Sequence, residues 1–246
     1  MNQLVVVLLA VKHQNIQHNY SHTFKIGKYG MEKRGSLDKM IKKFPKPKGR
    51  DAIKAWNHNK IIEASIEVVA KYGIAGTTIS RVVALADVSR GLINIHFKSK
   101  EILLKETLNY MFAAYNHTVD TAVKKAGPNP VDQIKAIVTT DFDPKILNKK
   151  NMGVWFAFRA QIRSMPEHLE MVETRDTSLT NHLIRICEAL NSKGNYGVPV
   201  TSIVRGFMVM LEGYWLDFHL HPKNYDREEA KNTCLLFLSG LFPKHF

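Results

Sequence analysis

Residues 77–104 read TTISRVVALADVSRGLINIHFKSKEILL, and this stretch decides the fold. Apolar side chains recur at helical spacing on both sides of a four-residue link, Ala86 to Ser89. The link is too short for anything but a tight turn, and Ser89 is a residue type that begins helices. The pattern predicts a helix-turn-helix at residues 78–97, whose second helix would lie in the major groove of DNA. An αα-hairpin without a DNA role is the alternative.

Helical spacing continues outward from this motif to the end of the chain. It predicts a helix over residues 57–72 that stops at Gly73, and a long helix over 99–126 that Ser99 caps. Further helices, separated by Gly and Pro residues, are expected at 131–141, 149–164, 167–191, 200–220 and 226–241. No convincing alternation of period two follows residue 12. We therefore expect an all-α fold.

Three parts of the chain follow from this pattern. Residues 1–56 are expected to be a basic, disordered N-terminal extension, because Lys and Arg gather there and Pro45 and Pro47 interrupt them. Residues 57–104 would form a three-helix DNA-binding domain that contains the helix-turn-helix. Residues 105–246 would form a helical domain for ligand sensing and dimerisation.

The positive charge is concentrated at one end of the chain. The formal net charge is +13; residues 1–110 hold 19 Lys and Arg against 8 Asp and Glu, whereas residues 111–246 hold 16 against 14. A basic end suits a polyanion, because binding to phosphates releases condensed counterions. A solvated basic tail without a partner is the alternative.

Several other classes of protein fit the sequence poorly. No apolar run approaches the roughly 18 residues of a membrane-spanning helix, the longest being Leu4 to Val11. Cys187 and Cys234 are too few for a disulfide framework, and a reducing cytoplasm is the simplest location. The sequence contains no HExxH, GxSxG or GxGxxG motif and no P-loop. His219 and His221 lack a third metal ligand. We expect no enzyme, no catalytic residue, no cofactor and no metal.

A peripheral membrane protein is the competing hypothesis from a different class. Such a protein would bind anionic lipid through the apolar segment from Leu4 to Val11 and the Lys-rich stretch before Arg50. Deleting residues 1–50 separates the two hypotheses, since a DNA-binding protein should keep its site and a membrane-bound one should lose its attachment. We favour the DNA-binding protein and expect no membrane partner.

The residues of the helix-turn-helix also match a family pattern. Thr77-Thr78, Ala86-Asp-Val-Ser-Arg-Gly91, His96-Phe97 and the stretch from Lys100 to Leu103 occur in order. From Asn57 to about Tyr110 the chain thereby resembles the DNA-binding domain of the TetR family of bacterial repressors. Asp87 replaces the usual turn glycine, and Asp tolerates the left-handed conformation better than most residues. His96 stands where Tyr is usual, so a phosphate contact there would be pH-sensitive.

The resemblance implies two groups of DNA contacts. Thr78 and Arg81 on the first short helix, with His96 and Lys100, would touch phosphates. Residues at or near base edges would be Ser89, Arg90, Gly91, Leu92, Ile93 and Asn94. Arg90 can pair with guanine and Asn94 with adenine, while a phosphate contact is the alternative for Arg90. Leu92, Ile93 and Phe97 can instead be core residues, which is the interpretation we prefer for Phe97.

The C-terminal half carries a second resemblance. Its segments are Phe142-Asp-Pro, Trp155-Phe-Ala-Phe158, Arg175 to Leu183, Leu211-Glu-Gly-Tyr-Trp-Leu216 and Asp226 to Ala230. In order and spacing they resemble BetI-like members of the same family, which repress choline-to-glycine-betaine genes. The resemblance covers residues 57–242 and implies a small-molecule effector, choline or a related cation. A TetR-family regulator of an efflux or catabolic operon with a different ligand is the alternative.

Several aromatic residues are candidates to contact such an effector. A quaternary ammonium has no proton to donate and is recognised by aromatic faces with a carboxylate nearby. The candidate ligand-binding residues are Trp155, Phe158, Tyr214 and Trp215, with Phe156, Glu212 and Asp217 as further material. Aromatic residues at helical spacing are also typical of a core, which is the alternative for each of them.

The last two helices are expected to form a homodimer. The apolar residues proposed for the interface are Val204, Phe207, Met208, Leu211, Leu235, Leu238 and Leu241. Two-fold symmetry would set two recognition helices about 34–36 Å apart and require a palindromic operator. The helix over 99–126 would then carry a ligand-driven shift to both of them.

Overall fold

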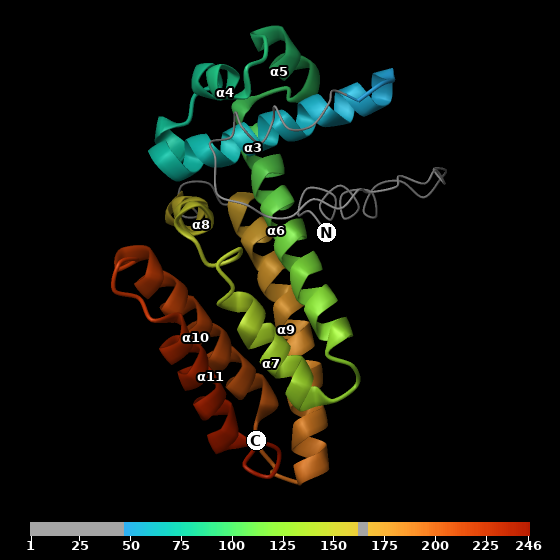
Figure 1. The fold of residues 1–246 in the computed structure, drawn as a ribbon, viewed down its shortest axis with the longest axis vertical. Helices are drawn as coiled ribbons and strands as arrows, with labels where there is room; N and C mark the ends of the chain where they lie inside the picture. Colours follow the sequence, from blue (N-terminus) through green and yellow to red (C-terminus); the bar gives the residue numbers. More distant parts are fainter. Residues whose placement is uncertain (1–46, 162–166) are drawn as a thin grey trace.

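The computed structural model describes residues 47–161 and 167–246, and within these ranges it contains helices joined by turns and no strand (Figure 1). The prediction for residues 1–46 lies outside the described part. The helices, in chain order, are α3 (Arg50–Gly76), α4 (Ile79–Ala86), α5 (Arg90–His96), α6 (Lys100–Lys125), α7 (Pro130–Asp141), α8 (Lys149–Gln161), α9 (Glu167–Gly194), α10 (Val200–Leu220) and α11 (Arg227–Leu241). The all-α expectation is confirmed.

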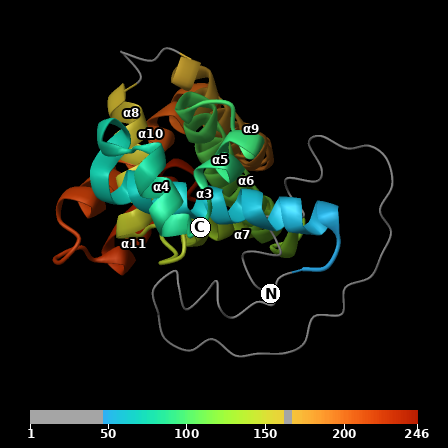
Figure 2. The same cartoon turned by 90° about the horizontal axis from the view of Figure 1, so that it is seen from above.

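The helices form two tiers. The upper tier holds α4 and α5 above the long helix α3, and the lower tier holds α7 to α11, with α8 directly below α3 (Figure 1). Seen from above, α3, α4 and α5 cover the end of α6, which runs away beneath them (Figure 2). Helix α6 therefore belongs to both tiers, as expected of the helix over residues 99–126.

Side-chain hydroxyls set the helix starts around the turn. The side chains of Thr78, Ser89 and Ser99 each accept a hydrogen bond from the backbone N–H three residues later, at 3.2–3.3 Å. These caps satisfy donors that have no partner within the helix. Asp87 ends α4 in the left-handed conformation, with φ 48° and ψ 57°. The tight turn predicted between Ala86 and Ser89 is confirmed.

Helix α3 departs from expectation at its start. It begins at Arg50, seven residues before the expected boundary at Asn57, so the last residues assigned to a disordered extension are helical. Gly73 interrupts the helix with φ 66° and ψ 178°, as its role as a stop predicted, and one more turn follows to Gly76. That conformation is one that glycine adopts without steric cost.

Helix α8 packs directly on α3. A Cβ atom placed on Gly153 of α8 would lie 3.2 Å from the carbonyl oxygen of Ala70 on α3, so a side chain there would require the two helices to shift slightly apart. Lys150 Nζ also lies 3.0 Å from Glu67 Oε1 across the same contact. The lower tier therefore touches the helix-turn-helix tier through α8 as well as through α6.

Both tiers share one hydrophobic core. The cluster of buried side chains is continuous from Ile61 and Ile62 on α3, through Leu103 and Leu108 on α6, to Phe242 after α11. The two tiers are therefore packed against each other through buried apolar side chains. The helix-turn-helix is thus mounted on the C-terminal helices without an intervening linker.

Candidate functional site

Helices α4 and α5 present most of the sequence-predicted contact residues on the outside of the upper tier. Thr78, Arg81, Ser89, Arg90, Gly91 and Asn94 are exposed, and Leu92, His96 and Lys100 are partly buried. A capping hydroxyl uses one lone pair as an acceptor and keeps its O–H as a donor. Thr78 and Ser89 can therefore cap their helices and still donate to a phosphate oxygen.

Two arginines are held in place by neighbouring groups. Arg90 Nη2 on α5 donates to Ser80 Oγ on α4 at 2.8 Å, which joins the two short helices. The guanidinium of Arg81 lies 4.4 Å from the ring centroid of Tyr72 and donates to the carbonyl oxygen of Gly76. Both guanidinium groups have five donors, so each keeps donors for a further acceptor.

Ile93 lies in the core, which is the alternative given for this residue. Its side chain is 1% exposed, and Phe97, one turn later, is also 1% exposed. These two residues anchor α5 to the tier beneath it, because positions four residues apart share one face of a helix. The structure instead exposes 71% of Ile95, a residue that the sequence pattern did not single out.

Cationic groups gather where the end of α5 meets α3. The rings of His96 and His58 lie 5.8 Å apart, and His58 Nε2 pairs with Glu106 Oε2 of α6 at 2.7 Å. Partial burial, and then the positive charges of His58 and Lys54, lower the pKa of His96 below its usual value, although Glu106 acts in the opposite direction. Burial and neighbouring positive charge thus both favour the neutral form of the His96 ring in the free protein.

The ammonium group of Lys100 makes one hydrogen bond within the protein. Its Nζ donates to the carbonyl oxygen of Ile74 near the end of α3 at 3.2 Å. A lysine ammonium has three donors, so two remain for a phosphate. The contact also positions the start of α6 against α3.

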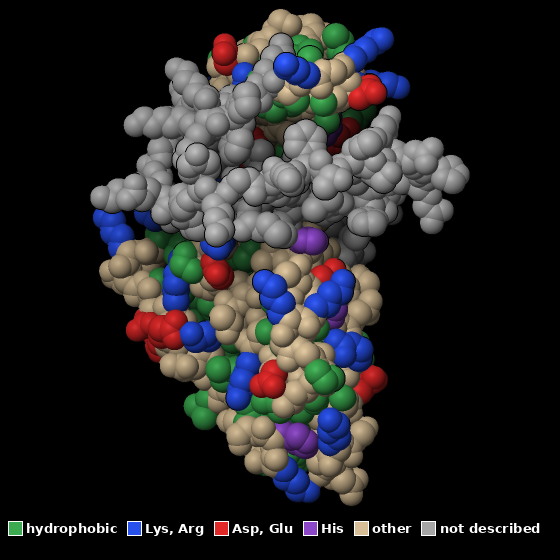
Figure 3. All heavy atoms as spheres, turned by 45° about the vertical axis from the view of Figure 1, so that its right-hand side comes forward, with side chains coloured by type: hydrophobic (Ala, Val, Ile, Leu, Met, Phe, Trp, Pro, Cys, Tyr) green, Lys and Arg blue, Asp and Glu red, His purple; other side chains and the backbone are tan. Residues whose placement is uncertain are grey.

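Most of the excess charge lies outside this tier. Residues 1–46 contain 9 Lys and Arg against 2 Asp and Glu, whereas residues 47–110 contain 10 against 6. Figure 3 shows basic and acidic side chains side by side at the edges of the upper tier, and both kinds interspersed over the lower tier. The basic character of the described upper tier is moderate.

An aromatic cluster occupies the lower tier just beneath α3. Trp155 of α8 and Trp215 of α10 have ring centroids 6.1 Å apart at an interplanar angle of 82°. Phe112 of α6 lies 5.4 Å from Trp155, and Tyr115 lies 5.8 Å from Trp215. The structure thus brings Trp155 and Trp215 together, joined by two α6 residues that were not predicted. Both tryptophans are at most 4% exposed and lie in the core, which is the alternative given for them.

The other two candidates for ligand contact lie differently. Phe158 is completely buried, and Tyr214 packs on Phe142, with ring centroids 5.8 Å apart. A buried carboxylate adjoins the cluster, because Tyr115 donates to Asp141 Oδ1 at 2.6 Å and Asp141 is 0% exposed. Asp141 was not selected from the sequence, where it stands alone at the end of a helix.

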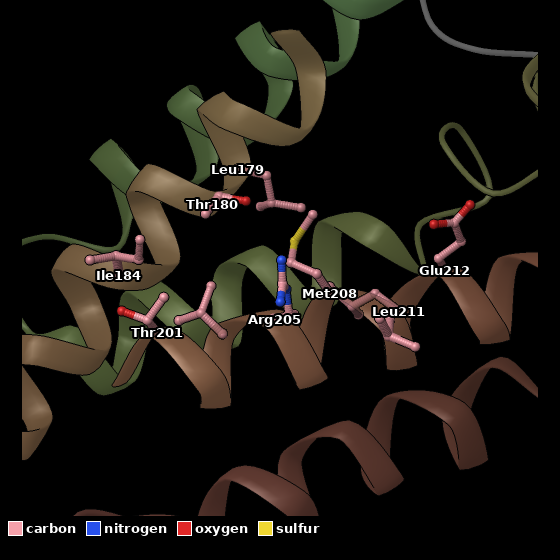
Figure 4. A pocket seen from close by; sticks show the side chains of 10 residues that line it. Leu179, Thr180, Ile184, Thr201, Arg205, Met208, Leu211 and Glu212 are labelled. Atoms are coloured by element: carbon pink, nitrogen blue, oxygen red, sulfur yellow. The ribbon is translucent and has the colours of Figure 1, made fainter. Parts of the chain in front are cut away.

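A cavity of about 480 Å³ opens between α9 and α10 (Figure 4). Its wall is mainly apolar, with Leu179, Met208 and Leu211 among its side chains, and it carries Arg205 and Glu212 as charged groups. Glu212 pairs with Arg159 at 2.6 Å, and the Arg159 guanidinium lies 5.1 Å from the centroid of the Trp155 ring. Glu212 therefore links the cavity to the aromatic cluster.

The outer faces of α10 and α11 carry exposed apolar side chains. Those with large exposed fractions are Val209, Leu216, Leu220, Leu236 and Phe237. Four residues expected at the dimer interface, Val204, Phe207, Leu211 and Leu238, are instead at most 3% exposed and belong to the core of the chain itself. The exposed apolar side chains thus lie on the two helices expected at the interface, but they belong to residues other than those named for it.

Other kinds of site are weakly supported in the described residues. Burial raises the pKa of Cys187 to about 11 and that of Cys234 to about 12, so neither thiol is reactive at neutral pH. No described helix is long and apolar enough to cross a membrane. No cluster of three metal-ligating side chains occurs among the described residues.

Comparisons with known proteins match both tiers. The family model for bacterial regulatory proteins of the tetR family matches residues 61–107, and that for the BetI-type transcriptional repressor C-terminal domain matches residues 130–243. The HTH-type transcriptional regulator BetI of Stenotrophomonas maltophilia is 25% identical over 186 residues, which are 75% of this chain and 92% of that protein.

Solved structures agree on the fold. The structure of a transcriptional regulator from Pseudomonas aeruginosa PAO1 is similar, with a TM-score of 0.70 and 21% identity over 78% of this chain and 91% of that one. The regulator FadR of Bacillus subtilis, solved in complex with stearoyl-CoA, gives a TM-score of 0.61 and 17% identity over 74% and 98%.

Proposed function

Because the chain belongs to the TetR family of bacterial regulatory proteins, with a C-terminal domain of the BetI type, we propose that α5 is the recognition helix of a ligand-responsive repressor. Members of this family are regulators and not enzymes. The observation that carries the proposal is the geometry of α4 and α5, which share the tight turn at Asp87 and expose Arg90 and Asn94.

Two kinds of DNA contact are proposed. Arg90 and Asn94 lie on the exposed face of α5 and read base edges, guanine and adenine respectively. Thr78, Arg81, His96 and Lys100 stand around them on other elements and contact phosphates, which sets the register of the helix on the duplex. Ser89 and Gly91 allow the start of α5 to approach the groove closely, and Leu92 lies at its margin.

Two substitutions test these roles against each other. Arg90→Ala should weaken binding to the preferred site by about 1–3 kcal/mol and relax the preference at one base pair. Lys100→Ala should weaken binding to all sequences alike and reduce the dependence of affinity on salt. Gel shifts at several salt concentrations measure both effects. If neither variant loses affinity, α5 is not the recognition helix.

A homodimer through α10 and α11 is proposed from the exposed apolar side chains. Val209, Leu216 and Leu220 follow one another along α10 at spacings of seven and four residues, which places them on one face. Leu236 and Phe237 are further exposed apolar side chains on α11, which packs beside α10. Pairing the surface with a second copy buries it and forms a symmetric four-helix contact. The operator is then palindromic.

We propose choline or a related quaternary ammonium as the effector. The support is the aromatic cluster around Trp155 and Trp215 with Asp141 nearby, together with the BetI-type match of this domain. The aromatic faces and the carboxylate match the chemistry of such a cation. The guanidinium of Arg159 already lies over the Trp155 ring, so a ligand cation at that face would replace it.

Binding at this cluster would act on the DNA-binding tier through two helices. Trp155 lies on α8, two residues from Gly153, where α8 touches α3. Phe112 and Tyr115 lie on α6, which Lys100 and Glu106 connect to α3. A ligand that favours the DNA-incompetent arrangement by about 1.4 kcal/mol lowers operator affinity tenfold.

Calorimetry with choline, betaine aldehyde and glycine betaine tests the effector class. Binding at millimolar concentration or below is expected, with quenching of tryptophan fluorescence, and Trp155→Ala should abolish the response while DNA binding stays. Arg159→Gln is the sharper variant, because removing the competing guanidinium should tighten choline binding. If none of the three compounds binds, the choline hypothesis fails, and a TetR-family regulator with another ligand remains.

A further inference from the structure

The side chain of Ile95 on α5 is exposed to solvent and takes no part in packing the helix against the rest of the protein. Its side chain is 71% exposed, whereas Ile93 and Phe97 on the same short helix are each 1% exposed. In the upper tier the other exposed large apolar side chains, Tyr72, Leu85 and Ile102, are 37–44% exposed. Ile95 is therefore the most exposed large apolar side chain of this tier.

The neighbours of Ile95 define its surroundings. Asn94 precedes it and is exposed, and Gly91, one turn earlier, is exposed and carries no side chain. A Cβ atom at Gly91 would meet only Ser89 Oγ, at 3.9 Å, so no other described residue packs against α5 at this position. Single exposed apolar residues are common on protein surfaces. Ile95 is notable because it lies on the proposed recognition helix, next to Asn94.

The major groove offers one apolar group to a recognition helix. Of the four bases only thymine presents a methyl group there, while the other edge groups are hydrogen-bond donors and acceptors. Isoleucine in a helix has one strongly preferred χ1 rotamer, so its methyl groups are held in place before binding. An exposed isoleucine beside two polar base-reading residues thus matches thymine.

We propose that Ile95 determines specificity for a thymine in each half-site by contacting its 5-methyl group. This inference rests on the proposed function, since it requires α5 to lie in the major groove. Burial of one methyl group contributes about fourfold in affinity, so two symmetric half-sites contribute about 15-fold. Arg90 and Asn94 would then read the neighbouring base pairs by hydrogen bonds.

The test removes the methyl group from the DNA and the side chain from the protein. The preferred site is first selected from random duplexes with the full chain. Each thymine of a half-site is then replaced, one at a time, by deoxyuridine, which lacks the 5-methyl group. Wild-type protein, Ile95→Ala and Asn94→Ala are compared on every duplex by gel shift.

One thymine per half-site should be sensitive to the replacement. Wild-type affinity should fall about fourfold there, and Ile95→Ala should bind the two duplexes equally, about 15-fold more weakly than wild type binds the unmodified duplex, because the variant lacks the contact in both half-sites. Asn94→Ala is the control, which should bind more weakly and keep the sensitivity. The Ile95 assignment is overturned if wild type is insensitive at every thymine, or if Ile95→Ala retains the full sensitivity. Failure to select any site overturns the DNA-binding function as well.

Discussion

Substitution by alanine should lower the free energy of unfolding strongly at Ile93 and hardly at all at Ile95, the two isoleucines of α5. Ile93 is 1% exposed, so Ile93→Ala removes three buried carbon groups. At about 0.8 kcal/mol for each, lost burial alone costs about 2.4 kcal/mol, and the remaining cavity brings the expected decrease in the free energy of unfolding to about 2–5 kcal/mol. Ile95 is 71% exposed, so Ile95→Ala loses only about 0.7 kcal/mol of burial. The better helix propensity of Ala offsets part of that loss.

Urea unfolding followed by far-UV circular dichroism measures both variants. All proteins are compared at one protomer concentration, because dimerisation makes apparent stability depend on concentration. We expect Ile95→Ala to stay within about 0.5 kcal/mol of wild type. Equal destabilisation by the two substitutions, or a neutral Ile93→Ala, would refute the orientation of α5.

The remaining predictions concern the interface and the DNA-facing surface. Leu236→Asp places a carboxylate in the exposed apolar surface of α11, and light scattering at micromolar concentration should then give the 28.0 kDa of a monomer where wild type gives twice that mass; an unchanged mass would contradict the proposed interface. Gly91→Val should leave the urea midpoint unchanged, because its side chain meets open space, but lower operator affinity at least tenfold; full affinity would argue against close approach of α5. A phosphate favours the protonated form of His96, whose pKa is lowered in the free protein. Binding then takes up a proton, so operator affinity should fall as pH rises through the range between the free and bound pKa values, and His96→Gln should lose this dependence.

Much of the fold follows from local sequence. The caps at Ser89 and Ser99 and the stop at Gly73 are short-range features, and each lies where the sequence predicted. The helix over residues 200–220 has the expected bounds for the same reason. The early start of α3 was missed because residues 50–56 lack a strong apolar stripe and follow a Lys-rich, Pro-containing stretch.

Faces and long-range contacts were harder to predict. In α10 and α11 apolar residues occupy more than one face, so periodicity could not say which face a second copy would cover and which face the chain itself buries. Ile93 was left between core and surface, and Ile95 was not singled out, because both belong to a short apolar run. The approach of Phe112, Tyr115 and Asp141 to the two tryptophans depends on tertiary packing, for which the sequence has no local signal.

Hydroxyl-radical footprinting of the full chain on its selected DNA tests the central claim, a dimeric repressor that reads DNA with α5 and releases it with ligand. Two symmetric half-sites should be protected, with centres about 34–36 Å apart or a multiple of that distance. The protection should weaken when a ligand that calorimetry has identified is added. A single or asymmetric protected site, or protection that is the same on every sequence, would contradict it.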